Sequence, residues 1–213
     1  MMNKQTSILI INGSLRGNAG NSGSIARRAE AFINSQEGIG VSILTLSDPM
    51  PSVRQVREML LQHTGFLIVS GVYWNNWSSL LQRFIEVVTP FENTEVFFGK
   101  PIACTVSMDS VGGIEIAARL HGVFSQFGCW SPPCSTLVVS RVGQGAVEAT
   151  KDEDDDPNED VWRLDDIEII LKNLIASANM NGNWEKWPNT EFKIDDGPWP
   201  STGPLDMESP IFL

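Results

Sequence analysis

The sequence has no long apolar run and few cysteines. No stretch approaches the roughly 20 apolar residues of a membrane-spanning helix, so we expect no membrane partner. The three cysteines (Cys104, Cys129 and Cys134) show no CxxC spacing, which argues against a metal site and against a disulfide framework. The first residues also lack the basic and apolar zones of a signal peptide, so we expect a cytoplasmic protein.

Basic residues are scarce in the last third of the chain. Residues 1–147 carry ten Lys/Arg against nine Asp/Glu, whereas residues 148–213 carry five against seventeen. An acidic balance of this kind repels phosphates, so we expect no nucleic-acid partner. We interpret residues 148–160, which include the run KDEDDDPNED, as an exposed acidic loop. Pro157 interrupts this run where a calcium loop needs glycine.

The apolar residues that are present follow two alternating patterns. Continuous apolar runs predict strands buried on both faces, and a more alternating run predicts an edge strand at 41–46. Helical periods lie between the strands, and a further helix is predicted over residues 161–178. The sequence therefore predicts an α/β fold with a doubly wound, five-stranded parallel sheet and helices on both faces. The four buried strands are expected at 7–11, 66–70, 101–106 and 135–139.

The connection after the first predicted strand is long and rich in glycine, reading NGSLRGNAGNSGS. Inward-facing backbone amides and the following helix N-terminus would form an anion site, and Arg16 adds a full positive charge. The fingerprints GxGxxG and GxxxxGK[ST] are both absent, so this loop predicts a phosphate site without a dinucleotide fold. The alternative is an ordinary polar connection in which Ser22 or Ser24 caps the helix. The candidate phosphate residues are Ser14, Arg16, Asn21, Ser22, Gly23 and Ser24.

Aromatic residues gather in the connection after the third predicted strand. The only tyrosine, Tyr73, stands beside Trp74 and Trp77, before the helical period begins. We expect these rings to be exposed, where they suit the face of a flat heteroaromatic ligand while amide side chains reach its edge. The alternative is a loop folded onto a hydrophobic subunit contact. The candidate ligand residues are Val72, Tyr73, Trp74, Asn75, Trp77 and Ser78.

Two glycines precede the helix after the fourth predicted strand. Gly112 and Gly113 permit close backbone approach, and the amides at the helix start would face a developing negative charge. The candidates here are Ser107, Met108, Asp109, Gly112 and Gly113. His121 lies well inside the helix and is left out. In an open parallel sheet the three connections meet at the carboxyl edge, where ligands bind.

Together these loops resemble the NAD(P)H-dependent FMN reductase family, a branch of the flavodoxin-like fold, over roughly residues 6–178. In that family the first loop reads G-S-x-R followed by Ser/Asn/Thr, and the second reads T-P-x-Y-W-x-x-x-S before a helix with L-K-x-F-I-D. The matching residues here are Gly13, Ser14, Arg16, Asn21 and Ser22, then 70–78 and 81–86. The family's Gly-rich third loop matches residues 107–113. Gly71 stands where the family usually has proline, which predicts a less rigid loop.

The resemblance implies a sheet of order 2-1-3-4-5 in a flavodoxin-like FMN-binding domain, residues 1–178, with an irregular C-terminal extension at 179–213. It also implies an oxidoreductase in which FMN receives hydride from NAD(P)H and passes electrons to a quinone, azo compound, metal, oxygen or flavin. Main-chain amides of the second and third loops would stabilise the reduced flavin. No catalytic side chain and no metal are expected. Two alternatives remain, a flavodoxin-like electron carrier and a flavin-free flavodoxin-like interaction module.

Aromatic residues outside the helical periods predict a homodimer or homotetramer. They exceed what the predicted sheet can cover, and closed pairing buries such a surface. The extension is expected either to wrap its own domain or to reach a neighbouring subunit. The residues that motivate this prediction are Phe91, Val96, Phe97, Phe98, Trp184, Trp187 and Trp199.

Overall fold

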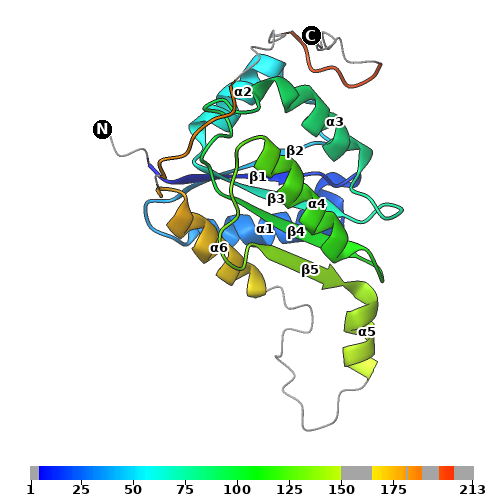
Figure 1. The fold of residues 1–213 in the computed structure, drawn as a ribbon. Helices are drawn as coiled ribbons and strands as arrows, with labels where there is room; N and C mark the ends of the chain where they lie inside the picture. Colours follow the sequence, from blue (N-terminus) through cyan, green and yellow to red (C-terminus); the bar gives the residue numbers. More distant parts are fainter. Residues whose placement is uncertain (1–4, 150–164, 181, 189–196, 204–213) are drawn as a thin grey trace.

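The computed structural model describes residues 5–149, 165–180, 182–188 and 197–203. Five parallel strands form one sheet in the order β2-β1-β3-β4-β5, as the sequence and its resemblance predict (Figure 1). The strands are β1 (Ser7–Asn12), β2 (Gly40–Thr45), β3 (Gly65–Gly71), β4 (Ile102–Met108) and β5 (Thr136–Ser140). The order reverses at β1, which pairs with β2 on one side and β3 on the other. The carboxyl ends of β1, β3 and β4 therefore share one edge at the switch point.

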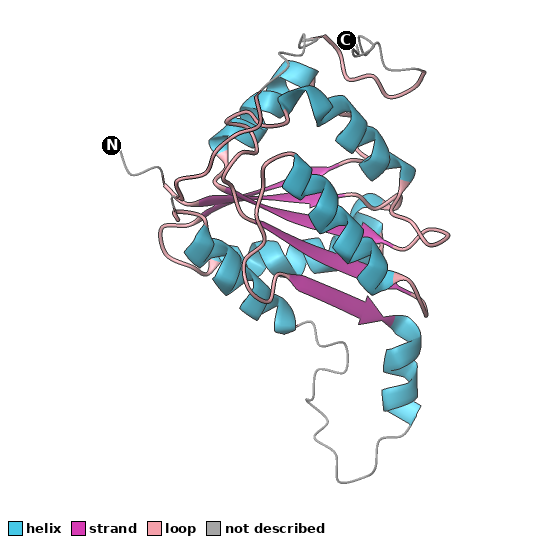
Figure 2. Cartoon of the chain, viewed as in Figure 1, coloured by secondary structure: helices cyan, strands magenta, loops and turns pink. Residues whose placement is uncertain are grey.

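Helices cover both faces of the sheet (Figure 2). One core lies beneath α2 (Val53–Gln62), α3 (Ser79–Val88) and α4 (Gly113–Gln126). The other lies beneath α1 (Asn21–Asn34) and α6 (Asp166–Ser177), which contact each other. Short 3-10 turns are present at Gly17–Ala19 and Thr89–Phe91.

The strand sequences explain this double burial. Successive residues of β1 alternate between the two cores, so that Leu9 and Ile11 face α2 and α3 while Ile8 and Ile10 face α1 and α6. Every residue of β3 is likewise buried. β2 is only partly buried and forms one edge of the sheet, which confirms the edge strand predicted at 41–46. The expectation that the strand at 135–139 is buried on both faces is wrong, because β5 forms the other edge and its alternate residues are only half-buried.

The expectation of an uncovered aromatic surface after α3 is wrong. Phe91, Val96 and Phe97 are buried in the core beneath α2, α3 and α4. The Phe97 ring centroid lies 5.6 Å from that of Phe66 and 5.1 Å from that of Phe127. This segment packs into the core before β4 begins, so its apolar side chains are covered by the same chain.

The chain after β5 also differs from the prediction. A helix, α5 (Arg141–Ala149), follows the strand directly and extends beyond the carboxyl edge (Figure 1). The predicted acidic loop at 148–160 therefore starts inside this helix, and residues 150–160 lie outside the described residues. Of the helix predicted at 161–178, residues 161–164 lie outside the described residues and Asp166–Ser177 forms α6.

The described parts of the C-terminal extension lie against their own chain. Trp184 lies beside Gly99, and the Lys186 Nζ atom lies 4.9 Å from the Phe98 ring centroid. Residues 197–203, here called the strap, cross α2 and α3, where Trp199 stacks on Phe84 with ring centroids 6.1 Å apart. Trp184 and Trp187 stay exposed, so only Trp199 of the three joins the core.

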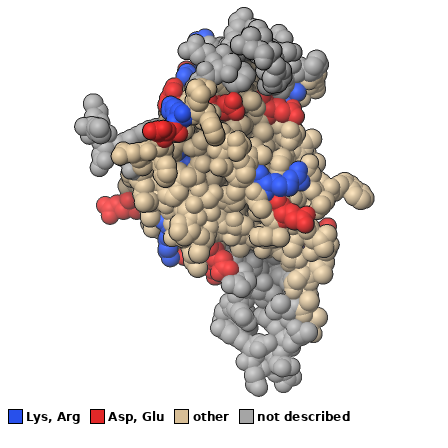
Figure 3. Space-filling view, in the orientation of Figure 1, with Lys and Arg blue, Asp and Glu red and all other residues tan. Residues whose placement is uncertain are grey.

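The outer surface is mixed in charge. On the face shown in Figure 3, acidic and basic side chains lie interspersed on a mostly uncharged surface. Among the described helices, none combines the length and apolarity that a membrane crossing requires.

Candidate active site

Three loops meet at the carboxyl edge of the sheet and touch one another. We call residues 13–20 the first loop, 72–78 the second and 109–112 the third. The Tyr73 hydroxyl accepts a hydrogen bond from the Leu15 amide at 3.2 Å, and the Ser78 hydroxyl donates to the Gly13 carbonyl. A Cβ atom at Gly112 would lie 2.5 Å from Asn75 Oδ1, so the second and third loops are also in contact. The three loops that carry most of the candidate residues are therefore in contact with one another.

A buried asparagine organises the first loop. The Asn12 side chain accepts from the Ser14 amide at 3.1 Å and donates to the Gly17 carbonyl at 3.3 Å. The Ser14 hydroxyl, also buried, accepts from the Arg16 amide at 3.2 Å. Sequence reasoning missed Asn12, although an amide side chain at the end of an otherwise apolar strand is a usable signal for such a turn.

No described side chain caps the first amides of α1, whose N-cap is Gly20. The alternative in which Ser22 or Ser24 caps this helix is therefore wrong. Ser22 is buried and its hydroxyl lies 3.2 Å from that of Ser107, while the Ser24 hydroxyl accepts from Arg27 at 3.1 Å. A Cβ at Gly23 would lie 2.6 Å from the Gly17 carbonyl oxygen, so only glycine lets the helix start so close to the first loop.

Two guanidinium groups flank this helix start. Arg16 is exposed beside it, as is Asn21. Arg27, which sequence reasoning missed, donates to the Asn18 carbonyl and to Ser24 from the next turn of α1. Amides, hydroxyls and guanidinium groups around an uncapped helix N-terminus are the donor set that a phosphate ester requires. The residues present therefore fit the phosphate of FMN.

The second loop holds a strained turn. Tyr73 and Asn76 exchange two backbone hydrogen bonds of 2.7 and 3.0 Å, and the two residues between them, Trp74 and Asn75, have φ of 49° and 60°. Left-handed backbone suits glycine or asparagine in such a turn, and a tryptophan there is an outlier. Trp74 is fully exposed at the tip. Strain held at an exposed aromatic side chain is typical of a functional position.

Trp77 is not exposed, and that expectation is wrong for this residue. It is only 8% exposed, its indole Nε1 donates to Gln82 Oε1 at 2.9 Å, and the Arg119 guanidinium lies 4.7 Å from its ring centroid. The reason is that Trp77 immediately precedes Ser78, the N-cap of α3, and folds back against α3 and α4. Its contact with a ligand stays a prediction.

Gly71 gives the Tyr73 ring its place. A Cβ at Gly71 would lie 3.3 Å from the Tyr73 ring, so the glycine lets the ring pack against the end of β3. The loop that lacks the family's proline is tied instead by the Tyr73–Asn76 turn and by Ser78.

The third loop is built on two glycines and supported by α5. Gly112, with φ of 88°, is the N-cap of α4, and the Gly113 amide donates to Met108 Sδ at 3.2 Å. The Asp109 carbonyl accepts from the Val142 amide at 2.8 Å and from the Ser140 hydroxyl at 3.2 Å. The start of α5 therefore fixes the third loop, a contribution that the sequence did not predict.

Titratable groups with shifted pKa lie elsewhere. Burial raises the pKa of the Cys104 and Cys129 thiols, so neither is a thiolate nucleophile. Burial also lowers the pKa of His121, which lies 2.6 Å from the Ser131 hydroxyl through Nδ1 and 2.9 Å from the Thr136 hydroxyl through Nε2. Thr136 begins β5, so this histidine sits toward the amino edge, away from the three loops.

The fold is that of a flavodoxin-like α/β protein, with three loops in contact at the carboxyl edge of the sheet. A family model described as NADPH-dependent FMN reductase matches residues 6–144, and the chain belongs to this family. It is accordingly an oxidoreductase that uses FMN as cofactor and NAD(P)H as reductant. None of the curated proteins matches this sequence.

Solved structures share the fold at low identity. The apo form of the NADH:FMN oxidoreductase EmoB is 14% identical, with 81% of this chain and 89% of that chain covered and a TM-score of 0.62. FerB, an NAD(P)H:(acceptor) oxidoreductase from Paracoccus denitrificans, is 14% identical, with 82% and 97% covered and a TM-score of 0.59. Two-electron reduced flavodoxin from Megasphaera elsdenii is 15% identical, with 81% and 98% covered and a TM-score of 0.51. At these identities the likeness shows the fold alone.

Proposed function

We propose that this protein transfers electrons from NAD(P)H, through FMN bound at the three loops, to a flat aromatic acceptor of the quinone or azo class. Bound FMN supplies the redox chemistry, since it accepts hydride from the nicotinamide and gives two electrons to the acceptor. The protein's part is to bind, orient and stabilise charge. We choose this class of acceptor because exposed apolar side chains form a rim around the three loops.

The first loop would hold the phosphate of FMN. The phosphate dianion would receive hydrogen bonds from the amides at the start of α1 and from Ser14, and positive charge from the Arg16 guanidinium. Asn12 fixes the loop in this shape, because it bonds both to the Ser14 amide and to the Gly17 carbonyl. The phosphate would then anchor the cofactor while the ring reaches the other two loops.

The second and third loops would hold the flavin ring. The amides of Val72, Tyr73, Asn76 and Trp77 are bonded within the protein. The amides of Trp74, Asn75 and the third loop are therefore the donors that we assign to negative charge on the ring. Gly112 allows Asn75 to approach the third loop, so both loops act as one surface.

The rim favours an apolar acceptor over a hydrated metal ion. Large apolar side chains are exposed on the first loop, on the second loop, on the third loop and on the first turn of α4, namely Leu15, Trp74, Val111 and Ile114. Such side chains stabilise a flat apolar molecule by removing its surface from water, whereas a hydrated ion gains nothing from them. Nothing in this arrangement requires a side-chain acid or base.

The test is a comparison of acceptors on the FMN-loaded protein. Stopped-flow reduction with NADPH and with NADH is followed by reoxidation with menadione, methyl red or ferric citrate. We expect menadione or methyl red to be faster than ferric citrate, and Trp74→Ser to raise KM for the aromatic acceptors while leaving the ferric rate unchanged. Fastest reoxidation by ferric citrate would refute the choice of acceptor. A purified protein that binds no FMN would favour an interaction module instead.

The same rim supports the predicted homodimer or homotetramer. Phe91 and Phe97 are buried and Phe98 is half-buried, so the case for pairing now rests on the exposed side chains of the rim. A partner placed over this rim would close the acceptor site, since two-fold pairing is the commonest way to bury such a surface.

A further inference from the structure

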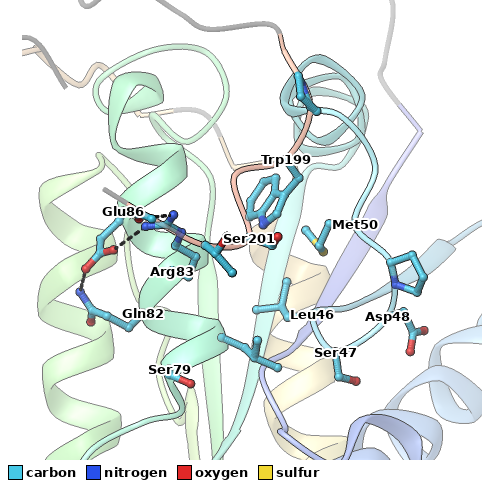
Figure 4. A pocket seen from close by; sticks show the side chains of 15 residues that line it. Leu46, Ser47, Asp48, Met50, Ser79, Gln82, Arg83, Glu86, Trp199 and Ser201 are labelled. Carbon is cyan, nitrogen blue, oxygen red and sulfur yellow. Dashed lines mark hydrogen bonds and ion pairs between the residues drawn. The ribbon is translucent and has the colours of Figure 1, made fainter. Parts of the chain in front are cut away.

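A cavity of about 820 Å³ lies beside the first loop, where its wall residue Ser47 lies against Gly17 (Figure 4). Its walls are the connection from β2 to α2, the outer side of α3 and the strap. In Figure 4 the Trp199 ring points into the space between Met50 and Arg83. The volume falls within the roughly 300–1,000 Å³ of ordinary small-molecule sites. None of the residues that we assign to FMN lines it.

The strap wall of this cavity is firmly anchored. The Arg83 guanidinium donates from Nε to the Pro200 carbonyl at 2.6 Å and from Nη2 to the Gly203 carbonyl at 2.7 Å. The Arg83 side chain is only 17% exposed, so its charge-assisted bond to the Pro200 carbonyl is partly shielded from water, whereas the bond to Gly203 is exposed. Trp199 stacks on Phe84, and the Gly197 carbonyl accepts from the Val53 amide at the start of α2. The cavity is therefore preformed.

The walls combine an aromatic face, apolar side chains and carboxylates. Trp199, Met50 and Leu80 supply apolar surface. Glu86 is held in place, since its Oε1 accepts from Gln82 Nε2 at 2.9 Å and its Oε2 lies 3.9 Å from Arg83 Nη1. Asp48 adds a second carboxylate at the wall. The two carboxylates outnumber the one guanidinium of the lining, Arg83, so the lining is negative on balance.

We propose that this cavity binds a planar aromatic cation, which stacks on Trp199 and places its positive charge on the side of Asp48, since Glu86 on the opposite side is paired with Arg83 (Figure 4). An indole face attracts cations, and apolar walls favour a flat ring system. An anion would meet two carboxylates, and the one cation of the lining, Arg83, is already paired with Glu86 and bonded to the strap. This site goes beyond the proposed function, and the strap lies beyond residues 6–144 that match the family model.

The experiment uses the FMN-loaded full chain, so that the flavin loops are filled. Proflavine, a planar cation at neutral pH, and 9-anthracenecarboxylate, a planar anion, are titrated by calorimetry while free flavin fluorescence is monitored. We expect proflavine to bind with one site per chain and no release of FMN, and the anion not to bind. Displacement of FMN by proflavine, or equal binding of both probes, would overturn the proposal.

Variants locate the site. Trp199→Ala should weaken proflavine binding roughly five- to twentyfold through lost stacking and cation–π attraction. Asp48→Asn, whose side chain anchors nothing in the strap, should weaken it about threefold. Trp187→Ala and Glu58→Gln make the same changes outside the lining and should leave binding unchanged. If the two controls weaken binding as much as the lining variants, proflavine binds the surface and the proposal fails. These outcomes need no turnover, so they stand apart from the test of the proposed function.

Discussion

Arg16 offers the sharpest test of the phosphate site. Its guanidinium is exposed beside the uncapped start of α1 and forms no hydrogen bond or ion pair with the residues that the structure describes. A hydrogen bond to a charged group contributes about 1.5–3 kcal/mol, and exposure to solvent favours the lower half of that range. Arg16→Ala should therefore weaken FMN binding by about 1.5–2 kcal/mol, which is roughly a ten- to thirtyfold rise in Kd.

Riboflavin is the internal control, since it lacks the phosphate. Fluorescence titration of the flavin-free protein should give the same riboflavin affinity for Arg16→Ala and the unaltered chain. Lys172→Ala, which removes one positive charge on α6, should leave both ligands unaffected. Added salt should reduce the difference in FMN affinity between Arg16→Ala and the unaltered chain, because salt screens an exposed charge. An equal loss for FMN and riboflavin would mean that Arg16 supports the fold, and the reasoning would be refuted.

Further predictions concern the Tyr73–Asn76 turn, the third loop, His121 and the oligomeric state. Trp74→Gly should raise the free energy of unfolding in urea by about 1 kcal/mol by relieving the left-handed strain, yet lower the rate with menadione. Gly112→Ala should lower that free energy by about 1–2 kcal/mol, since φ is 88° and the new Cβ meets Asn75; an unchanged midpoint would contradict this. His121 is half-buried and desolvation lowers its pKa in the folded chain, so below about pH 6.5 the unfolded chain binds more protons than the folded chain and the free energy of unfolding should fall as the pH falls; His121→Gln should flatten this dependence. Light scattering of the full chain at micromolar concentration should give the mass of a dimer or a tetramer. The mass of a monomer would contradict the predicted homodimer or homotetramer.

The fold was predictable because three of the four strands expected to be buried, β1, β3 and β4, carry a true burial signal, whereas the apolar run of β5 does not reflect burial on both faces. β1 and β3 read as unbroken apolar runs, which only a strand covered on both faces requires, and both are buried throughout their apolar residues. α5 escaped prediction for a physical reason. Gly143 and Gly145 weaken its helical pattern, and the helix start is fixed by bonds to Ser140 and Asp109 that no local pattern contains.

The sequence predicts which loops form the candidate site, but it does not predict which of their side chains are buried. Glycine and aromatic residues mark the loops locally, whereas the burial of Trp77 depends on Gln82 one turn along α3 and on Arg119 from α4. Arg27 likewise reaches back over the first loop from inside α1. Whether such a side chain is buried depends on contacts between different helices and loops. The hydrophobic periodicity of a single segment carries no information about those contacts.

The Tyr73–Asn76 turn shows how such a site can be recognised without a ligand. A two-residue turn of this shape is most stable with asparagine and glycine at its centre, yet here the two positions hold Trp74 and Asn75. Left-handed backbone costs roughly 1–2 kcal/mol at each non-glycine residue, and Trp74 recovers none of it by packing, since it is fully exposed. Asn75 is pressed against Gly112, whose own left-handed backbone and missing Cβ make room for it. Two loops are thus shaped to hold one exposed indole and one amide at the switch point of the sheet. The exposed indole adds no packing energy to the fold, so we infer that this position serves a ligand.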